Sequence, residues 1–149
     1  MKRTLIWQHL DDTQHFAKRL AQHAKAGFVL CLNGDLGAGK TTFVKYFFAA
    51  LGVREMVNSP TFTLYKVYDH EPLLIHVDAY RIEDERLAYE MDEVFDDTAI
   101  TVIEWSSNVP SYLPHDRLEL TLIWQDETQR KVEVTAYGNT QAWLDQLMA

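Results

Sequence analysis

The sequence contains little cysteine, glycine or proline: one, six and four of these residues, respectively, in a chain of 149. A single cysteine, Cys31, cannot form a disulfide within the chain, which excludes a disulfide-stabilised scaffold and favours a reducing compartment. No apolar run approaches the roughly 18 residues of a membrane-spanning helix, and the apolar run TLIW is too short for a secretion signal. We therefore expect a cytoplasmic protein that has no membrane partner.

Positive charge is also scarce, with 14 lysines and arginines against 22 aspartates and glutamates. This balance argues against a chain whose main task is to bind a nucleic-acid backbone, because such domains carry a basic face. Most of the excess acid lies in residues 83–97, EDERLAYEMDEVFDD, which hold eight acids and one base. Two interpretations of this acidic segment remain open: a solvated helix face, or a docking surface for a basic partner.

Hydrophobic patterning predicts an α/β fold in which residues 1–149 form a single domain, with a mixed sheet flanked by helices. The last two expected strands are joined by QDETQ and should form a C-terminal antiparallel hairpin. The expected strands are 4–7, 28–33, 62–68, 73–77, 99–105, 118–124 and 131–137. The expected helices are one that Asp11 caps and Gly27 ends, 40–51, a short one in the acidic segment, and 140–148.

The stretch GDLGAGKT, residues 34–41, matches the phosphate-binding pattern G-x-x-x-x-G-K-[ST]. It follows an apolar strand and opens a helix, where glycines let successive backbone N–H groups turn toward one anion. Lys40 would bridge the outer phosphate oxygens, the Thr41 hydroxyl would bind Mg²⁺, and Thr42 would reach an inner phosphate. The pattern predicts a P-loop that binds a nucleotide.

Two acidic residues, Asp78 and Glu104, each follow a buried strand and are candidates to complete the site. Hydrolysis needs a carboxylate that positions Mg²⁺ or water, and such folds supply it at the carboxyl end of a neighbouring strand. The alternative for each acid is a strand end that merely reaches solvent. Spacing does not decide which acid binds the metal. His76 should share a strand face with Asp78 and is expected to be structural.

Trp105 and Thr61 are two further candidates beside these acids. Trp105 follows Glu104 directly and would either stack against the site or pack in the core. Thr61 lies in NSPTFTLY, residues 58–65, where related nucleotide-binding folds keep a switch loop. It would either contact the terminal phosphate or Mg²⁺, or belong to an ordinary turn.

With GDLGAGKT, SPTF, HVDAYR and EW in this order, the chain resembles the TsaE (YjeE) family of small bacterial P-loop ATPases. The resemblance implies an Mg²⁺-dependent ATPase that supports a complex of TsaB and TsaD, which makes threonylcarbamoyl-adenosine next to the anticodon of certain tRNAs. In this picture the partners handle the tRNA, so its contact with this chain is only indirect.

The resemblance also implies roles for individual residues. Lys40, Asp78 and Glu104 would be catalytic, Thr41 and Glu104 would bind Mg²⁺, and Thr61 would be the switch residue. Trp105 would lie close to the nucleotide, and Asp11 or Thr13 would approach the base. The residues that would hold the phosphates are Asp35, Leu36, Gly37, Ala38, Gly39, Lys40, Thr41 and Thr42.

The chain departs from the family pattern at two positions. Ser107 stands where family members often carry Glu or Gln, and the sequence near Asp92 lacks the usual glycine. An alternative function is a small-molecule P-loop kinase, although only Arg81 and Arg86 lie near a plausible lid. A third possibility is a nucleotide-dependent binding module that hydrolyses little.

Overall fold

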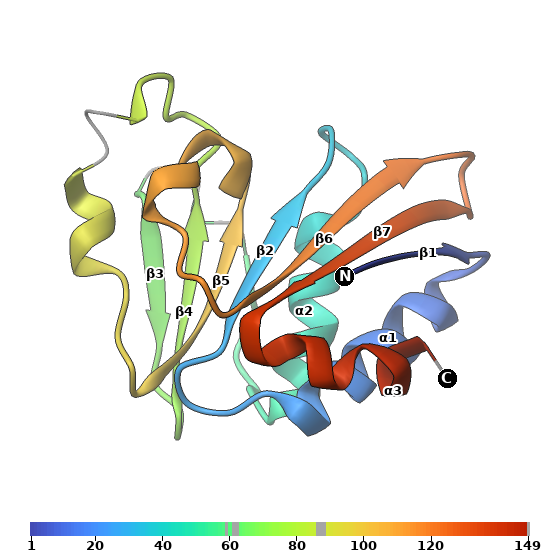
Figure 1. Ribbon diagram of the computed structural model, residues 1–149, viewed down its shortest axis with the longest axis horizontal. Coiled ribbons are helices and arrows are strands. Elements are labelled where there is room, and N and C mark those ends of the chain that lie inside the picture. Colours follow the sequence, from blue (N-terminus) through green and yellow to red (C-terminus); the bar gives the residue numbers. More distant parts are fainter. Residues whose placement is uncertain (59, 61–62, 86–88, 149) are drawn as a thin grey trace.

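Seven strands of the computed structural model form one sheet with the order β1-β7-β6-β2-β5-β4-β3 (Figure 1). The structure describes residues 1–58, 60, 63–85 and 89–148. The strands are β1 (Lys2–Trp7), β2 (Val29–Asn33), β3 (Tyr65–Tyr68), β4 (Leu73–Asp78), β5 (Ala99–Glu104), β6 (Arg117–Trp124) and β7 (Arg130–Tyr137). The α-helices are α1 (Leu10–His23), α2 (Lys40–Leu51) and α3 (Leu144–Met148), and short 3₁₀ helices span Tyr89–Glu93, Ser106–Asn108, Pro110–Tyr112 and Gly138–Trp143.

The sheet is mixed, which confirms the expected α/β class. The central strands β6, β2, β5 and β4 run parallel, so their carboxyl ends meet at one edge. The predicted C-terminal hairpin is confirmed, because β6 and β7 pair antiparallel along their whole length. Patterning did not predict that β1 would pair with β7 or that β3 would run antiparallel to β4.

Helices α1 and α2 cover one face of the sheet and bury a continuous apolar cluster against it (Figure 1). The ring of Phe43 stacks on that of Trp7 with centroids 5.7 Å apart, and Phe47 and Phe48 are fully buried beside it. Phe43, Phe47 and Phe48 of α2 therefore pack in the core. Cys31 is also fully buried, within a second cluster on the opposite face.

Helix α2 begins and ends where the sequence predicts, and Gly52 follows it with a positive φ of 106°. The prediction that Asp11 caps α1 is wrong. The N-cap is His9, whose N–H donates to the Asp12 carboxylate at 3.3 Å, and Asp11 lies exposed in the first turn. Asp12 makes this contact because it occupies the third helical position, from which a side chain reaches back to the N-cap backbone.

Three other predicted elements have different bounds in the structure. The strand expected at 62–68 is β3, which starts at Tyr65, and residues 61–62 lie outside the described residues. In place of the expected short helix, the acidic segment has the 3₁₀ helix Tyr89–Glu93. The predicted C-terminal helix begins as a 3₁₀ helix, Gly138–Trp143, in which the Thr140 hydroxyl shares its hydrogen bond between the carbonyls of Arg117 and Tyr137. No helix in the described ranges is long and apolar enough to span a bilayer.

Candidate functional site

A cleft of about 1160 Å³ opens at the edge where the parallel strands end. The turn between β2 and α2, the first residues of α2, and the ends of β4 and β5 line it. Residues 63–65 and 80–82 and Glu90 line it as well. Ligands of open α/β sheets bind at this edge because loops from several strands converge there. The cleft is therefore the place to test the residues that the sequence singles out.

The turn of residues 34–39, here called the glycine-rich turn, has a backbone that requires glycine. Gly39 has a φ of 106° and Gly34 a φ of 144°. A Cβ on Gly34 would also lie 2.4 Å from the carbonyl oxygen of Leu122. The turn leads into α2, whose N-cap Gly39 provides no side-chain hydrogen bond. The first N–H groups of α2 thus keep the capacity to bind an anion.

Lys40 places its ammonium group over the glycine-rich turn. Its Nζ donates to the carbonyl oxygens of Gly34 and Asp35 at 2.6 and 3.0 Å and lies 4.4 Å from the centre of a Trp105 ring. Burial lowers the pKa of Lys40, and the nearby carboxylates, Glu104 above all, oppose that shift. The result is a desolvated cation at the mouth of the turn.

Glu104 is the most enclosed carboxylate of the cleft, with 3% of its surface exposed. The Thr41 hydroxyl donates to its Oε1 at 3.4 Å, and His76 Nε2 lies 2.5 Å from its Oε2. His76 is fully buried, and its Nδ1 has no partner among the described residues. Because a carboxylate oxygen can only accept, Nε2 is the donor of the hydrogen bond to Glu104. Sequence reasoning placed His76 beside Asp78 but missed this contact.

Asp78 ends β4 directly opposite Glu104 in the strand register. Its Oδ1 accepts a hydrogen bond from the Tyr80 N–H at 2.9 Å, and its side chain lines the cleft. The two acids that the sequence identified at strand ends thus lie in one cleft with Lys40 and Thr41. The alternative, that each acid merely reaches solvent, does not describe Glu104, which is buried.

Trp105 adopts a left-handed backbone conformation, with a φ of 59° that costs a non-glycine residue roughly 1 kcal/mol. The backbone N–H of Trp105 donates to the Leu32 carbonyl at 2.8 Å, and the centroid of its indole ring lies 5.0 Å from that of the Tyr80 ring. Asn33 supports the next turn by accepting from the Ser106 hydroxyl and the Ser107 N–H. The sequence analysis did not identify Asn33 as a supporting residue, because it ends an otherwise apolar strand.

A second, smaller cavity of about 180 Å³ lies against Ala38 and is lined in part by Thr13. Thr13 is 6% exposed, whereas Asp11 is exposed and does not line it. The β6–β7 hairpin closes this cavity through Glu127, Thr128 and Arg130, which the sequence did not single out.

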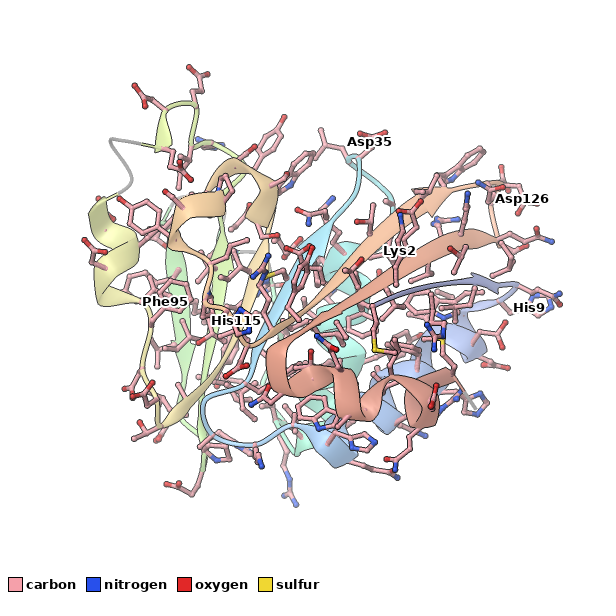
Figure 2. The ribbon with its side chains drawn as sticks, in the orientation of Figure 1. Lys2, His9, Asp35, Phe95, His115 and Asp126 are labelled. Carbon is pink, nitrogen blue, oxygen red and sulfur yellow. The ribbon has the colours of Figure 1, made fainter. Side chains whose placement is uncertain are left out.

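The remaining candidates are separated from this group. Asp35 is exposed and lines neither cavity, and Figure 2 shows it projecting from the tip of the glycine-rich turn. Thr61 lies outside the described residues.

Within the described part of the chain, no group of three His, Cys, Asp or Glu side chains is arranged to hold a metal ion. Leu36, Gly37, Gly39, Lys40, Thr41, Thr42, Asp78, Glu104 and Trp105 all line the larger cleft.

Comparison with known proteins adds an independent result. Residues 7–132 match the family model described as threonylcarbamoyl adenosine biosynthesis protein TsaE. The chain is 43% identical over 130 residues to the tRNA threonylcarbamoyladenosine biosynthesis protein TsaE of Bacillus subtilis, covering 87% of this chain and 82% of that protein. It is 40% identical over 134 residues to the protein of the same name from Aquifex aeolicus, covering 87% and 93%. The crystal structure of YdiB from Bacillus subtilis superimposes with a TM-score of 0.80 and 35% identity, covering 99% of this chain and 96% of that one.

Proposed function

The chain belongs to the TsaE family of threonylcarbamoyl adenosine biosynthesis proteins, and we propose that it is an Mg²⁺-dependent P-loop ATPase. In this proposal residues 1–149 act as one cytoplasmic ATPase domain that supports a TsaB–TsaD complex in threonylcarbamoyl modification of adenosine next to the tRNA anticodon. The observation that carries the proposal is that Lys40, Thr41, Asp78 and Glu104 line a single cleft.

The glycine-rich turn and the start of α2 are the proposed phosphate-binding element. Uncapped N–H groups at the N-terminus of α2 and the positive end of its dipole favour an anion. The Lys40 ammonium now donates to two carbonyls of the turn. A phosphate chain in the turn would offer Nζ charged oxygens in their place, and hydrogen bonds between charged groups are the stronger kind.

Thr41 and Glu104 fit an Mg²⁺ ion that is completed by other ligands. Mg²⁺ prefers oxygen atoms and usually takes only one or two from protein, the rest coming from water and phosphate. The Thr41 hydroxyl and the Glu104 carboxylate are 3.4 Å apart, and the described residues offer no larger ligand group. When bound, Mg²⁺ would neutralise charge on the phosphates. His76 would keep the Glu104 carboxylate oriented toward Thr41.

Asp78 is the proposed residue of the hydrolytic step. Its Oδ1 is held by the Tyr80 N–H, so its orientation is fixed before any ligand arrives. A carboxylate at this edge can accept a hydrogen bond from a water molecule and turn that water toward a terminal phosphate. Trp105 would shield the Lys40 side of the cleft, because its indole lies over the ammonium group.

The acidic balance of the chain supports a protein partner more than direct binding to tRNA. A net charge of −8 is unfavourable for contact with a phosphate backbone. We therefore assign tRNA contact to TsaB and TsaD. The acidic segment, residues 83–97, is the proposed surface for a basic region of these partners.

An ATPase assay with and without the TsaB–TsaD pair tests this function. Purified protein, Mg²⁺ and ATP are combined with increasing amounts of the pair, and phosphate release is measured. Lys40→Ala is the matched inactive control, because it removes the cation over the turn. We expect hydrolysis that the pair changes and that Lys40→Ala abolishes. Hydrolysis that the pair leaves unchanged would contradict the coupling and favour a small-molecule kinase, while equal nucleotide binding by Lys40→Ala would contradict the P-loop.

A further inference from the structure

The β6–β7 hairpin and the glycine-rich turn are joined by one arginine side chain. Arg130 Nε donates to the carbonyl oxygen of Ala38 at 2.9 Å. Its Nη1 donates to the carbonyls of Asp126 and Gln129, at 2.7 and 2.9 Å. Figure 2 shows Asp35 and Asp126 at the tips of these two turns, which lie at the same edge of the sheet.

The hairpin turn is a firm anchor for this arginine. The Asp126 carboxylate accepts hydrogen bonds from the N–H groups of Thr128 and Gln129, at 2.9 and 2.8 Å. These N–H groups lower the pKa of Asp126, because they stabilise the charged carboxylate. The hairpin turn is therefore held by its own hydrogen bonds, and Arg130 links this turn to the Ala38 carbonyl.

The contact fixes the direction of one peptide group. In a trans peptide the C=O and the following N–H point in opposite directions. Since the Ala38 oxygen points toward Arg130 and the smaller cavity, the Gly39 N–H points away from them. Ala38 lines only the smaller cavity, whereas Gly39 lines both cavities and is the residue of this peptide that reaches the larger cleft. The peptide thus directs a hydrogen-bond donor toward the side of the turn that faces the cleft.

A glycine at this place makes such a constraint necessary. Gly39 has a φ of 106°, and glycine populates positive and negative φ with similar ease. The Ala38–Gly39 peptide therefore has a competing flipped orientation, in which the N–H would turn away from the cleft. An external hydrogen bond to the Ala38 oxygen selects one of the two orientations.

The geometry points to Arg130 as a positioning residue that presets the Gly39 N–H for a phosphate group. This inference rests on the proposed function, since phosphate is the ligand that the N–H would meet. Arg130 touches neither the cleft nor Asp78 or Glu104, and it acts through the Ala38 carbonyl. The competing role is purely structural, in which Arg130 only ties the hairpin together.

Two variants and one control separate these roles. Arg130→Gln removes the charge and shortens the reach, whereas Arg130→Lys keeps a charged donor. Lys131→Gln removes a charge from the next residue of β7, whose side chain makes no hydrogen bond or ion pair with the described residues of either turn. For each protein, ADP affinity is measured by calorimetry, thermal stability by calorimetric unfolding, and the Gly39 amide by ¹⁵N NMR in the absence and presence of ADP. With only six glycines in the chain, the Gly39 signal can be assigned.

We expect Arg130→Gln to weaken ADP binding by about tenfold, the value of one hydrogen bond to a charged group. Arg130→Lys should recover most of this affinity, and Lys131→Gln should bind as the unmodified protein does. The Gly39 amide resonance should move in ligand-free Arg130→Gln and stay in place in Lys131→Gln.

An ADP affinity within twofold of the unmodified protein, or an unmoved Gly39 resonance in Arg130→Gln, would overturn the inference. Equal loss of affinity in the Gln and Lys variants, accompanied only by lower thermal stability, would assign Arg130 to hairpin structure alone. Failure of the unmodified protein to bind ADP would contradict the proposed function instead. The Gly39 resonance of the free protein would still decide whether Arg130 orients this peptide.

Discussion

Nε2 of His76 lies 2.5 Å from Oε2 of Glu104, and both side chains are removed from solvent. The contact joins β4 and β5, in which His76 is level with Val102 and Asp78 is level with Glu104. Because residues two apart on a strand share a face, His76 and Glu104 meet diagonally across the pair. A buried carboxylate needs such a donor, since an unpaired charge in the interior is costly. His76 thereby stabilises Glu104 in the orientation that also meets Thr41.

Replacing Glu104 with Gln should reduce hydrolysis more than binding. The amide keeps the shape of the side chain but loses the charge that would hold Mg²⁺, so we expect turnover to fall by roughly 10²-fold. ADP affinity measured without Mg²⁺ should change little. Phosphate-release kinetics over a range of Mg²⁺ concentrations check this. Full turnover of this variant at ordinary Mg²⁺ concentrations would exclude Glu104 as a ligand of the metal ion.

Removing the His76 ring should destabilise the fold. His76→Ala leaves Glu104 without its buried donor and opens a cavity beside Phe48, whose ring centroid is 6.1 Å from that of His76. We expect a loss of about 3 kcal/mol in the free energy of unfolding. His76→Gln can still donate to Glu104 and should lose about 1 kcal/mol. Urea unfolding at neutral pH measures both, and equal losses would show that the hydrogen bond contributes little.

The sequence predicted the central architecture because its signals are local. Gly39 precedes and Gly52 follows the α2 helix, Lys40–Leu51. Continuous apolar runs predict the two strands that end in Asp78 and Glu104. These signals also predicted that the two acids and the start of α2 meet at one edge, because parallel strands bring their ends together.

The parts that the sequence did not predict depend on tertiary pairing. Nothing in the local pattern places β1 against β7 or brings Arg130 to Ala38, which are 92 positions apart in the chain. The contact between His76 and Glu104 depends on the register of β4 against β5, which patterning alone does not set. The cap of α1 was misassigned because Asp11 is a good capping residue by type, whereas the helix begins at Leu10, which makes His9 the N-cap and places Asp11 in the first turn.

Replacing Asp78 with Asn should separate binding from hydrolysis. The amide can still accept from the Tyr80 N–H, so the turn should persist, but it is a weaker acceptor for a water proton. We expect nucleotide affinity within a few-fold and turnover lower by about 10²-fold. Asp69→Asn, an exposed change between β3 and β4, is the control. Normal turnover in Asp78→Asn would assign the hydrolytic step to another group.

The Cys31 thiol should resist alkylation in the native protein. Burial, followed by the charge of Glu119, raises the pKa of Cys31 from 9.0 to about 12. At pH 8 the thiolate fraction should therefore be roughly 10³-fold smaller than in the unfolded chain. Reaction with a chromogenic disulfide, with and without urea, measures the difference. Rapid native labelling would show that β2 opens readily.

The same shift in pKa sets a direction for stability at high pH. Between about pH 9 and pH 12 the unfolded chain loses the Cys31 proton while the native protein retains it. The unfolded state is then favoured, so the Cys31 contribution to the free energy of unfolding decreases as pH rises through this range. Cys31→Ser gives a hydroxyl that does not titrate there, and its unfolding free energy should fall less steeply with pH.

Charge reversal in the acidic segment tests its proposed role in docking. Glu83 and Asp92 are exposed and do not line the larger cleft. The double change Glu83→Lys and Asp92→Lys should weaken binding of the TsaB–TsaD pair by about tenfold at low salt, mainly through slower association, and leave basal hydrolysis unchanged. The matched control is Glu55→Lys with Asp69→Lys, which shifts net charge equally at exposed positions outside the segment. Surface plasmon resonance at two salt concentrations measures both. Equal weakening by the two pairs would reflect net charge alone, and no weakening by either would show that the acidic segment is a solvated face.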